Sequence, residues 1–278
     1  MSSRSPLAAR FGRVSGFRAD RPLTEEEMQH YAPSVFATEA HGSRSARYTY
    51  IPTIEVLRGL GKEGFQPFSV VQARTRIEDR RAFTKHMIRL RYAGQINAEE
   101  AHEVILINSH DGSSSYQMLA GLYRFVCANG LVIGEQTHDV RVPHKGDIIG
   151  RVVEGAFEVL EDFKARGEQV ARMRALPLDR FERQVFAEAA LVLRFEEGQV
   201  PVTTEQVLTP RRWEDRREDL WTTFNVTQEN LVRGGLRGIN DRGRRTTTRA
   251  VQGIDGNVRL NRALWLLAER MQALKSAA

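Results

Sequence analysis

The sequence predicts an α+β fold, in which an antiparallel β-sheet of hairpins is covered by a long amphipathic helix and followed by a helical C-terminal part. Between residues 66 and 142, short runs of β-branched and aromatic residues follow one another, separated by polar or glycine-bearing breaks. Runs of this kind without helical segments between them favour antiparallel hairpins. From residue 147 onwards, apolar residues instead recur every three or four positions, which indicates helices. With 41% hydrophobic residues, the chain of 278 residues can bury a substantial core.

Residues 1–46 are predicted to form a mobile, basic N-terminal segment that contains one short helix. Thr24 precedes three glutamates, so it is placed to cap that helix while the carboxylates favour its N-terminal dipole. A second helix is expected after Thr53, which is a plausible N-cap, and Gly61 and Gly64 should end it. This helix opens the predicted sheet core, residues 47–176.

Period-2 alternation marks the strands of that core. In HMIRLRY, one face carries Ile88, Leu90 and Tyr92, and the other carries Met87, Arg89 and Arg91. In VVQARTR, the residues Gln72, Arg74 and Arg76 alternate with smaller or apolar ones. We therefore expect half-buried strands whose second face is solvated. Asn129–Gly130 is the strongest turn signal in the chain and predicts a further hairpin.

The helical pattern begins with an apolar stripe through residues 149–163, which is wide enough to cover a sheet. A second helix should begin near Pro177–Asp179, a third should close at Gly234–Gly235, and the last occupies the amphipathic stretch 258–275. Residues 177–278 are thus predicted to be a helical C-terminal part. It contains an arginine- and glycine-rich loop at residues 233–249.

Positive charge is concentrated in two places. The chain has 41 Lys and Arg against 35 Asp and Glu, giving a net charge of +6. Because this excess is modest, the distribution of charge along the chain indicates an anionic partner better than the net charge does. Seven basic residues lie between Arg74 and Arg91 with two acids, and six arginines lie between Arg233 and Arg249 with one acid, Asp241. Guanidinium groups can fork onto phosphate oxygens. The predicted nucleic-acid-binding residues are Arg74, Arg76, Lys85, Arg89, Arg91, Arg242, Arg244 and Arg245.

Each basic cluster also has a plainer interpretation. The arginines of the strands can form an ordinary solvated face, since any half-buried sheet needs one. The arginine-rich loop is either mobile until an anionic ligand orders it or a solvated loop that pairs with the acidic segment WEDRRED.

The candidate catalytic residues are His110 and Asp111, which lie at the start of a glycine- and serine-rich turn. They could serve a metal-assisted hydrolase, but one His and one Asp fall short of a metal site, and turn chemistry explains the segment better. The single cysteine, Cys127, lies in an apolar run and excludes a disulfide within the chain and a cysteine-based zinc site. We expect it to be a small buried hydrophobe. No P-loop motif is present, and we expect no metal and no cofactor.

The chain resembles a plasmid- and phage-borne family known as domain of unknown function 932. The residues that carry the resemblance are Asn108, His110, Asp111, Gly112, Arg124, Val126, Cys127, Asn129, Gly130, Asn225 and Thr227. The resemblance implies carriage on mobile genetic elements and brings no mechanism with it. The order of basic strands followed by a long helix is also similar to that of single-strand-annealing recombinases, which implies rings or filaments that hold single-stranded DNA in a basic groove.

We therefore predict sequence-independent binding and annealing of single-stranded DNA, in recombination or maintenance of plasmid or phage DNA, by a cytoplasmic homo-oligomer. The chain offers no apolar run long enough for a membrane span. Two alternatives remain: a metal-dependent nuclease or phosphodiester hydrolase centred on His110 and Asp111, and a protein-binding inhibitor of host defence.

Overall fold

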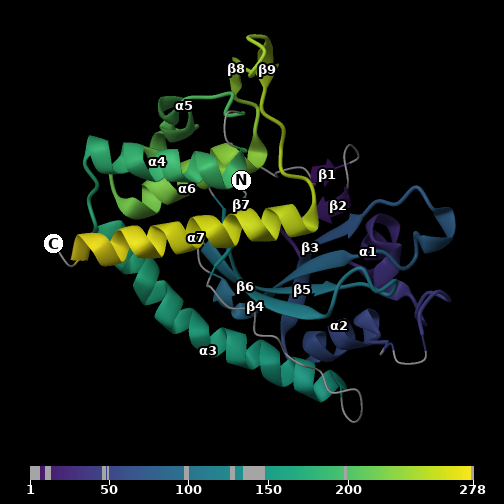
Figure 1. Ribbon diagram of the computed structural model, residues 1–278. Coiled ribbons are helices and arrows are strands. Elements are labelled where there is room, and N and C mark those ends of the chain that lie inside the picture. Colours follow the sequence, from purple (N-terminus) through teal and green to yellow (C-terminus); the bar gives the residue numbers. More distant parts are fainter. Residues whose placement is uncertain are drawn as a thin grey trace. The chain divides into compact units, whose positions relative to one another are not determined.

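The computed structural model describes residues 7–9, 14–45, 48, 50–96, 100–125, 129–133, 148–196 and 199–276 (Figure 1). The chain divides into two compact units. The sheet unit comprises Met1–Leu131, Gln136–Phe163 and Gln252–Ile254, and the helical unit comprises Val132–Glu135, Lys164–Val251 and Asp255–Ala278. Together they confirm the predicted α+β class: an antiparallel sheet comes first and a mostly helical part follows.

Within the described residues, the sheet has seven strands that lie in the order of the chain. The strands are β1 Leu7–Ala9, β2 Val14–Arg18, β3 Phe65–Ala73, β4 His86–Ile96, β5 Glu100–Asn108, β6 Gln117–Arg124 and β7 Asn129–Val132. Consecutive strands from β1 to β6 pair in antiparallel fashion. The β2 strand belongs to this sheet although its sequence lies within the predicted N-terminal segment 1–46.

One face of the sheet is apolar, as the alternation in the sequence predicts. Ile88 lies between Val70 of β3 and Leu106 of β5 in the strand register, and all three side chains are buried. Phe157 packs edge-on against Phe65, with ring centroids 5.3 Å apart. It belongs to the first half of α3 (Ile148–Ala175), so that part of the long helix packs on the sheet, while residues from Lys164 onwards belong to the helical unit.

Two short helices accompany the sheet. Helix α1 (Glu25–Tyr31) begins as predicted, with the Thr24 hydroxyl accepting from the backbone N–H of Glu27 in a capping box. Helix α2 (Thr53–Lys62) starts one residue earlier than predicted, because Pro52 takes the N-cap position. The Thr53 hydroxyl is therefore free for contacts inside the sheet unit.

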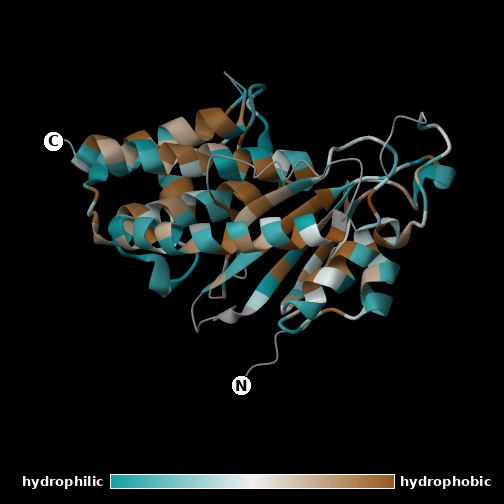
Figure 2. Ribbon diagram, turned by 90° about the horizontal axis from the view of Figure 1, so that it is seen from below, coloured by the Kyte–Doolittle hydropathy of each residue, from teal (hydrophilic) through white to brown (hydrophobic). Residues whose placement is uncertain are grey.

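The helical unit is built around α6. Its helices are α4 Arg180–Arg194, α5 Thr204–Leu208, α6 Leu220–Arg233 and α7 Ile254–Ser276, with the C-terminal part of α3. A short 3₁₀ turn occurs in this unit at Trp213–Asp215, and two more occur in the sheet unit at Pro33–Phe36 and Glu78–Arg80. Every α6 residue before Arg233 is buried, and Trp221 and Phe224 of α6 pack against Trp265 of α7. Figure 2 shows apolar and polar residues alternating along most helices, as expected for elements that bury one face.

No helix in the described part of the chain is both long enough and apolar enough to cross a membrane.

Candidate nucleic-acid interface

The arginine-rich segment folds as a β-hairpin in the helical unit. Strands β8 (Arg237–Ile239) and β9 (Arg245–Thr247) pair in antiparallel register, with Ile239 opposite Arg245. The Asn240 side-chain oxygen shapes the turn, because it accepts from the backbone N–H of Arg242 at 3.1 Å and of Arg244 at 2.9 Å. The segment is therefore ordered by its own backbone, whereas the sequence had suggested a loop.

The base of the hairpin is fixed to its surroundings. The backbone N–H of Ile239 donates to the Pro201 carbonyl at 2.9 Å, and the Gln206 side chain donates to the Arg237 carbonyl at 2.7 Å. The chain comes so close to Pro201 that a Cβ on Gly238 would lie 1.8 Å from its carbonyl oxygen. A glycine is required there, and these contacts hold the hairpin in one position.

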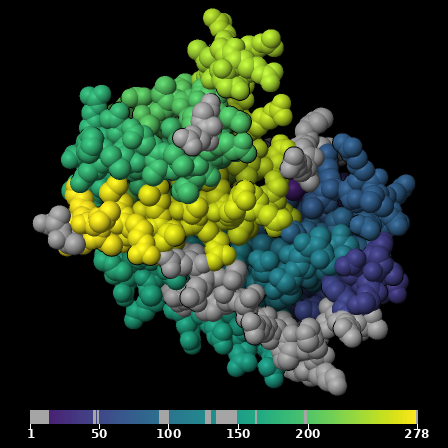
Figure 3. All heavy atoms as spheres, in the orientation of Figure 1, coloured from purple at the N-terminus to yellow at the C-terminus, as the bar shows by residue number. Residues whose placement is uncertain are grey.

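The tip of the hairpin carries unneutralised positive charge. It extends beyond α4, α5 and α6 in Figure 1, and its yellow-green atoms stand above the rest of the helical unit in Figure 3. The exposed arginines of this hairpin and its flanks are Arg237, Arg242, Arg244, Arg245 and Arg249. Among the residues that the structure describes, no carboxylate forms an ion pair with these five. We call them the hairpin arginines.

Three of the four acids in the segment WEDRRED pair with other arginines, and the fourth, Glu214, forms no ion pair with the hairpin among the described residues. Asp215 pairs with Arg212, Glu218 pairs with Arg183 at 2.6 Å, and Asp219 pairs with Arg217 at 3.0 Å. The alternative in which WEDRRED neutralises the arginine-rich loop therefore has no support in the described contacts.

A groove of about 660 Å³ runs beside the hairpin. Its walls are formed by Pro201, Thr203, Gln206, Arg237, Gly238, Ile239, Arg245, Thr246 and Thr247. The Ile239 side chain is 61% exposed and supplies an apolar surface next to the two lining arginines, Arg237 and Arg245. The groove thus offers guanidinium groups and a small apolar patch side by side, which suits a nucleotide unit with its phosphate and its base.

The arginines of β4 do not take part in such a surface, and here the prediction was wrong. Arg89 and Arg91 are buried, and both donate to the carboxylate of Glu103 on β5, at 2.8 Å and 3.0 Å. The alternation along β4 is as predicted, but both of its faces are covered. A buried guanidinium bound to a carboxylate cannot serve as a phosphate contact.

The Arg91 guanidinium is enclosed further by aromatic rings. Its central carbon lies 4.1 Å from the ring centroid of Tyr123 and 4.3 Å from that of Phe68, and its side chain is 1% exposed. Aromatic faces attract a guanidinium through their quadrupole. Tyr123 therefore packs against this internal arginine.

The remaining predicted residues lie where β3 ends and β4 begins. Arg74 and Arg76 follow the last residue of β3 and are exposed, while Lys85 is half-buried just before β4. Arg74 and Lys85 have interaction partners of their own. These residues belong to the sheet unit and the hairpin arginines to the helical unit, so the predicted nucleic-acid-binding residues are divided between the two units.

His110 and Asp111 do not form a common site. The His110 ring is buried beside His86, and the Thr53 hydroxyl lies 3.0 Å from Nε2 of His86 and 3.4 Å from Nε2 of His110. Burial lowers the pKa of His110 to about 4. The Asp111 carboxylate instead accepts from the backbone N–H of Ser113 at 2.9 Å, which is the turn chemistry that the sequence favoured.

Metal-ligand geometry is likewise not found. In the portions of the chain that the structure describes, no three His, Cys, Asp or Glu side chains are grouped so that they could hold a metal ion.

The turn that the sequence predicted at Asn129–Gly130 is not formed by these two residues, because they open β7. Cys127 lies outside the described residues.

Sequence reasoning missed two members of the interface, Arg237 and Arg249. Arg237 shares the outward face of the hairpin with Ile239 and Arg245, and an Asn-Asp-Arg-Gly stretch between short polar strands was the signal that could have revealed a hairpin. Arg233, by contrast, pairs with the buried Glu229 of α6 and is not part of this surface.

The sequence is similar to a known protein family and to proteins of Escherichia coli. The family described as Domain of unknown function (DUF932) matches residues 40–265. Two Escherichia coli (strain K12) proteins, UPF0380 protein YfjQ and UPF0380 protein YafZ, are each 56% identical to this chain over 265 residues, which is 95% of this chain and 97% of the relative. No solved structure matches. The chain belongs to the DUF932 family.

Proposed function

We propose that this protein binds single-stranded DNA through its phosphates, without preference for base sequence, and that the hairpin arginines make the contact. The observation that carries the proposal is the exposure of five arginines beside a single acid, Asp241, with no ion pair to any described carboxylate. Phosphate binding by lysine and arginine supplies the sequence-independent part of nucleic-acid affinity.

Arginines that hold phosphates leave the base edges free. Bases that remain accessible can pair with a complementary strand, so annealing follows from this mode of binding. The biological setting that we propose is the recombination or maintenance of plasmid or phage DNA by a homo-oligomer of this chain.

The direct test replaces Arg242, Arg244 and Arg245 with glutamate and measures binding to a fluorescently labelled oligonucleotide by anisotropy. The matched control makes the same charge change at Arg172, Arg259 and Arg270, which are exposed arginines on helices α3 and α7. We expect the hairpin variant to lose binding and the control to retain most of it, because Arg242, Arg244 and Arg245 occupy one short β-hairpin while the control arginines are spread over two helices.

Salt dependence gives a second measure. Each phosphate contact to a single strand contributes about 0.7 to the slope of log affinity against log salt, so loss of three contacts should lower the slope by about 2. Equal loss in the two variants, or an affinity of the parent protein that does not change with salt, would remove the proposal.

A further inference from the structure

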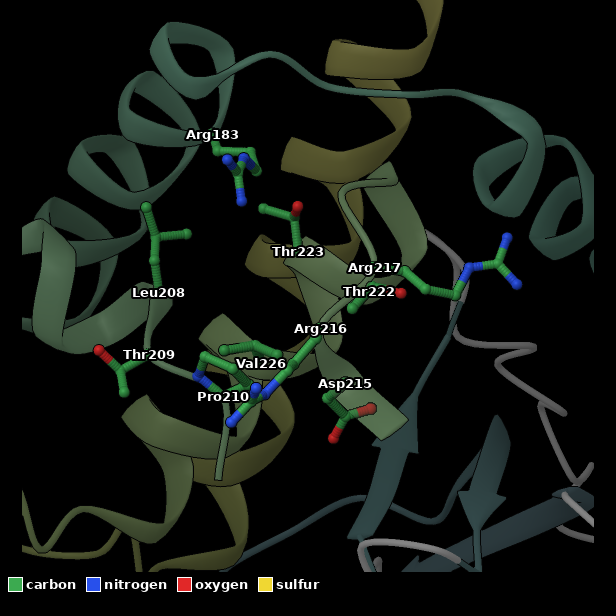
Figure 4. Close-up of a pocket in the computed structure, with 10 residues that line it drawn as sticks. All are labelled: Arg183, Leu208, Thr209, Pro210, Asp215, Arg216, Arg217, Thr222, Thr223 and Val226. Atoms are coloured by element: carbon green, nitrogen blue, oxygen red, sulfur yellow. The ribbon is translucent and has the colours of Figure 1, made fainter. Parts of the chain in front are cut away.

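A pocket of about 330 Å³ lies in the helical unit beside the first turns of α6 (Figure 4). It is lined by Arg183, Leu208, Thr209, Pro210, Asp215, Arg216, Arg217, Thr222, Thr223 and Val226. Its volume falls at the lower end of the range of small-molecule sites. The hairpin and its groove share none of these residues.

The charged side chains of the pocket leave a net positive lining. Asp215 is neutralised by Arg212, and Arg217 donates to Asp219 and points away from Arg183 in Figure 4. Arg183 pairs with Glu218, yet its Nε is buried and has no hydrogen-bond partner in the described structure. An N–H group left without an acceptor is a place where a ligand oxygen would lower the free energy.

Arg216 supplies a second guanidinium. It stacks on the ring of Trp213 with its central carbon 4.2 Å from the centroid, and no ion pair to it is found within the described ranges. The aromatic face fixes the plane of this guanidinium while leaving its N–H groups available. The stacking therefore orients a donor without neutralising it.

Thr223 supplies a further hydroxyl to the lining of the pocket. Its side chain lines the pocket and is 4% exposed, yet its hydroxyl makes no hydrogen bond within the part of the chain that is described. The neighbouring Thr222 hydroxyl, by contrast, donates to the Asp219 carboxylate at 3.1 Å. Figure 4 shows Thr223 next to Arg183 at the same end of the pocket.

The opposite wall is apolar. It is formed by Leu208, the last residue of α5, by Pro210 and by Val226 of α6, and Figure 4 shows Pro210 and Val226 side by side near Arg216. A ligand that fills the space therefore needs an anionic end for Arg183 and Thr223 and a flat or apolar body for this wall.

We infer that this pocket binds a nucleoside monophosphate. The phosphate accepts from Nε of Arg183 and from the Thr223 hydroxyl, and the base lies against Leu208, Pro210 and Val226, with Arg216 adding positive charge. The ligand is either a free nucleotide or the phosphorylated end of a DNA strand, since both present the same chemistry. The inference does not require that the hairpin binds DNA.

The test is calorimetric titration of the full-length protein with deoxyadenosine monophosphate, with deoxyadenosine, and with inorganic phosphate. We expect the monophosphate to bind and the other two to bind at least tenfold more weakly, because each lacks half of the recognised groups. Comparable binding of deoxyadenosine would overturn the phosphate contact, and comparable binding of inorganic phosphate would overturn the base contact.

Two variants locate the site. Thr223→Val removes a hydroxyl that has no partner in the protein, so it should leave the thermal stability of the free protein unchanged or raised. The same change should weaken monophosphate binding about tenfold, since a hydrogen bond to a charged group contributes about 1.5 kcal/mol or more. Arg183→Gln should weaken binding at least as much. Arg180→Gln, one turn earlier on α4 and outside the pocket, is the charge-matched control. Undiminished binding by Thr223→Val and Arg183→Gln would exclude this pocket.

A final pair of probes distinguishes the two sources of the ligand and separates this site from the hairpin. Oligonucleotides with a 5′-phosphate and with a 5′-hydroxyl are compared in the variant with glutamate at Arg242, Arg244 and Arg245. A preference for the 5′-phosphate assigns the pocket to strand ends, and equal binding with retained monophosphate affinity assigns it to free nucleotides. Loss of monophosphate binding in this variant contradicts the separation of the two sites.

Discussion

Glu103 holds together the buried charges of the sheet. Its two oxygens accept from Arg89 and Arg91, and Arg89 also donates to the Leu131 carbonyl at 3.2 Å. The strand register places Glu103 opposite Arg91, so the cluster consists of a cross-strand pair and one diagonal neighbour. Periodicity in the sequence predicts which residues share a face, but it cannot show that a charged face is covered, because that depends on the pairing of distant strands.

Glu103→Gln should destabilise the protein strongly. The substitution keeps the shape of the side chain but leaves two buried guanidinium groups without their carboxylate, and breaking such a pair costs about 3–5 kcal/mol. The measurement is chemical unfolding followed by circular dichroism. The exposed Glu26→Gln serves as a control and should change the free energy of unfolding by less than about 0.5 kcal/mol.

The buried histidines should make the stability depend on pH. Burial, and secondarily the nearby His110, lower the pKa of His86 from 6.5 to about 3. Between these values the unfolded chain binds more protons than the folded one, so the free energy of unfolding should fall as the pH drops below about 6.5.

The contribution of His86 is at most about 1.4 kcal/mol for each pH unit. His86→Gln should therefore show a shallower decline in unfolding free energy between pH 7 and pH 5, whatever its stability at pH 7. The exposed His30→Gln should keep the parent slope. An unchanged slope in His86→Gln would show that this ring does not resist protonation.

At the scale of elements, helices and strands with a strong local signal were predictable. Thr24 and the glutamates behind it define the start of α1, and Asp179 caps α4 by accepting from the backbone N–H of Glu182. The hairpin of β8 and β9 was not predicted, because its strands are three residues long and owe their position to contacts with Pro201 and Gln206. Contacts of this kind are absent from local sequence patterns.

Gly234→Ala should disrupt the junction between α6 and the hairpin. Gly234 has φ of +64°, which L-residues avoid, and an added Cβ would lie 2.6 Å from the Thr248 carbonyl oxygen. Backbone strain and overpacking each cost about 1–3 kcal/mol. Gly243 also has a positive φ, of +68°, but has open space around it.

Thermal unfolding of both variants tests this reasoning. Gly243→Ala should be destabilised only by backbone strain. Gly234→Ala should be destabilised clearly more, because overpacking adds to the strain, and it should also weaken oligonucleotide binding. Equal destabilisation would mean that the close approach to Thr248 is relieved without cost.

For the whole molecule, the class and the order of sheet and helices followed from the sequence, whereas the composition of the units did not. The helical period beginning near residue 147 predicted one long helix, and α3 is that helix. The division of α3 at Phe163 and Lys164 depends on which neighbours each half contacts, and those neighbours lie far away in the sequence.

Because α3 runs through both units, their unfolding should be coupled. Gly167 lies in the interior of α3, and a Cβ there meets no atom within 4 Å. Gly167→Ala should therefore raise the free energy of unfolding by about 0.5–1 kcal/mol. The tryptophans Trp213, Trp221 and Trp265 all belong to the helical unit, so their fluorescence reports on that unit while far-ultraviolet circular dichroism reports on both. The unfolding midpoints of the two signals should shift together in Gly167→Ala. A shift of one midpoint alone would show that the units unfold independently.

The path of the chain also limits how this protein can be dissected. Gln252–Ile254, which include the first residue of α7, belong to the sheet unit, and Val132–Glu135 belong to the helical unit although they precede α3. A fragment that ends at Phe163 would cut a helix between its turns and discard a returning segment. We therefore expect that neither unit folds as a simple truncation, and that a genetic screen that splits the gene at any single point recovers few functional pairs.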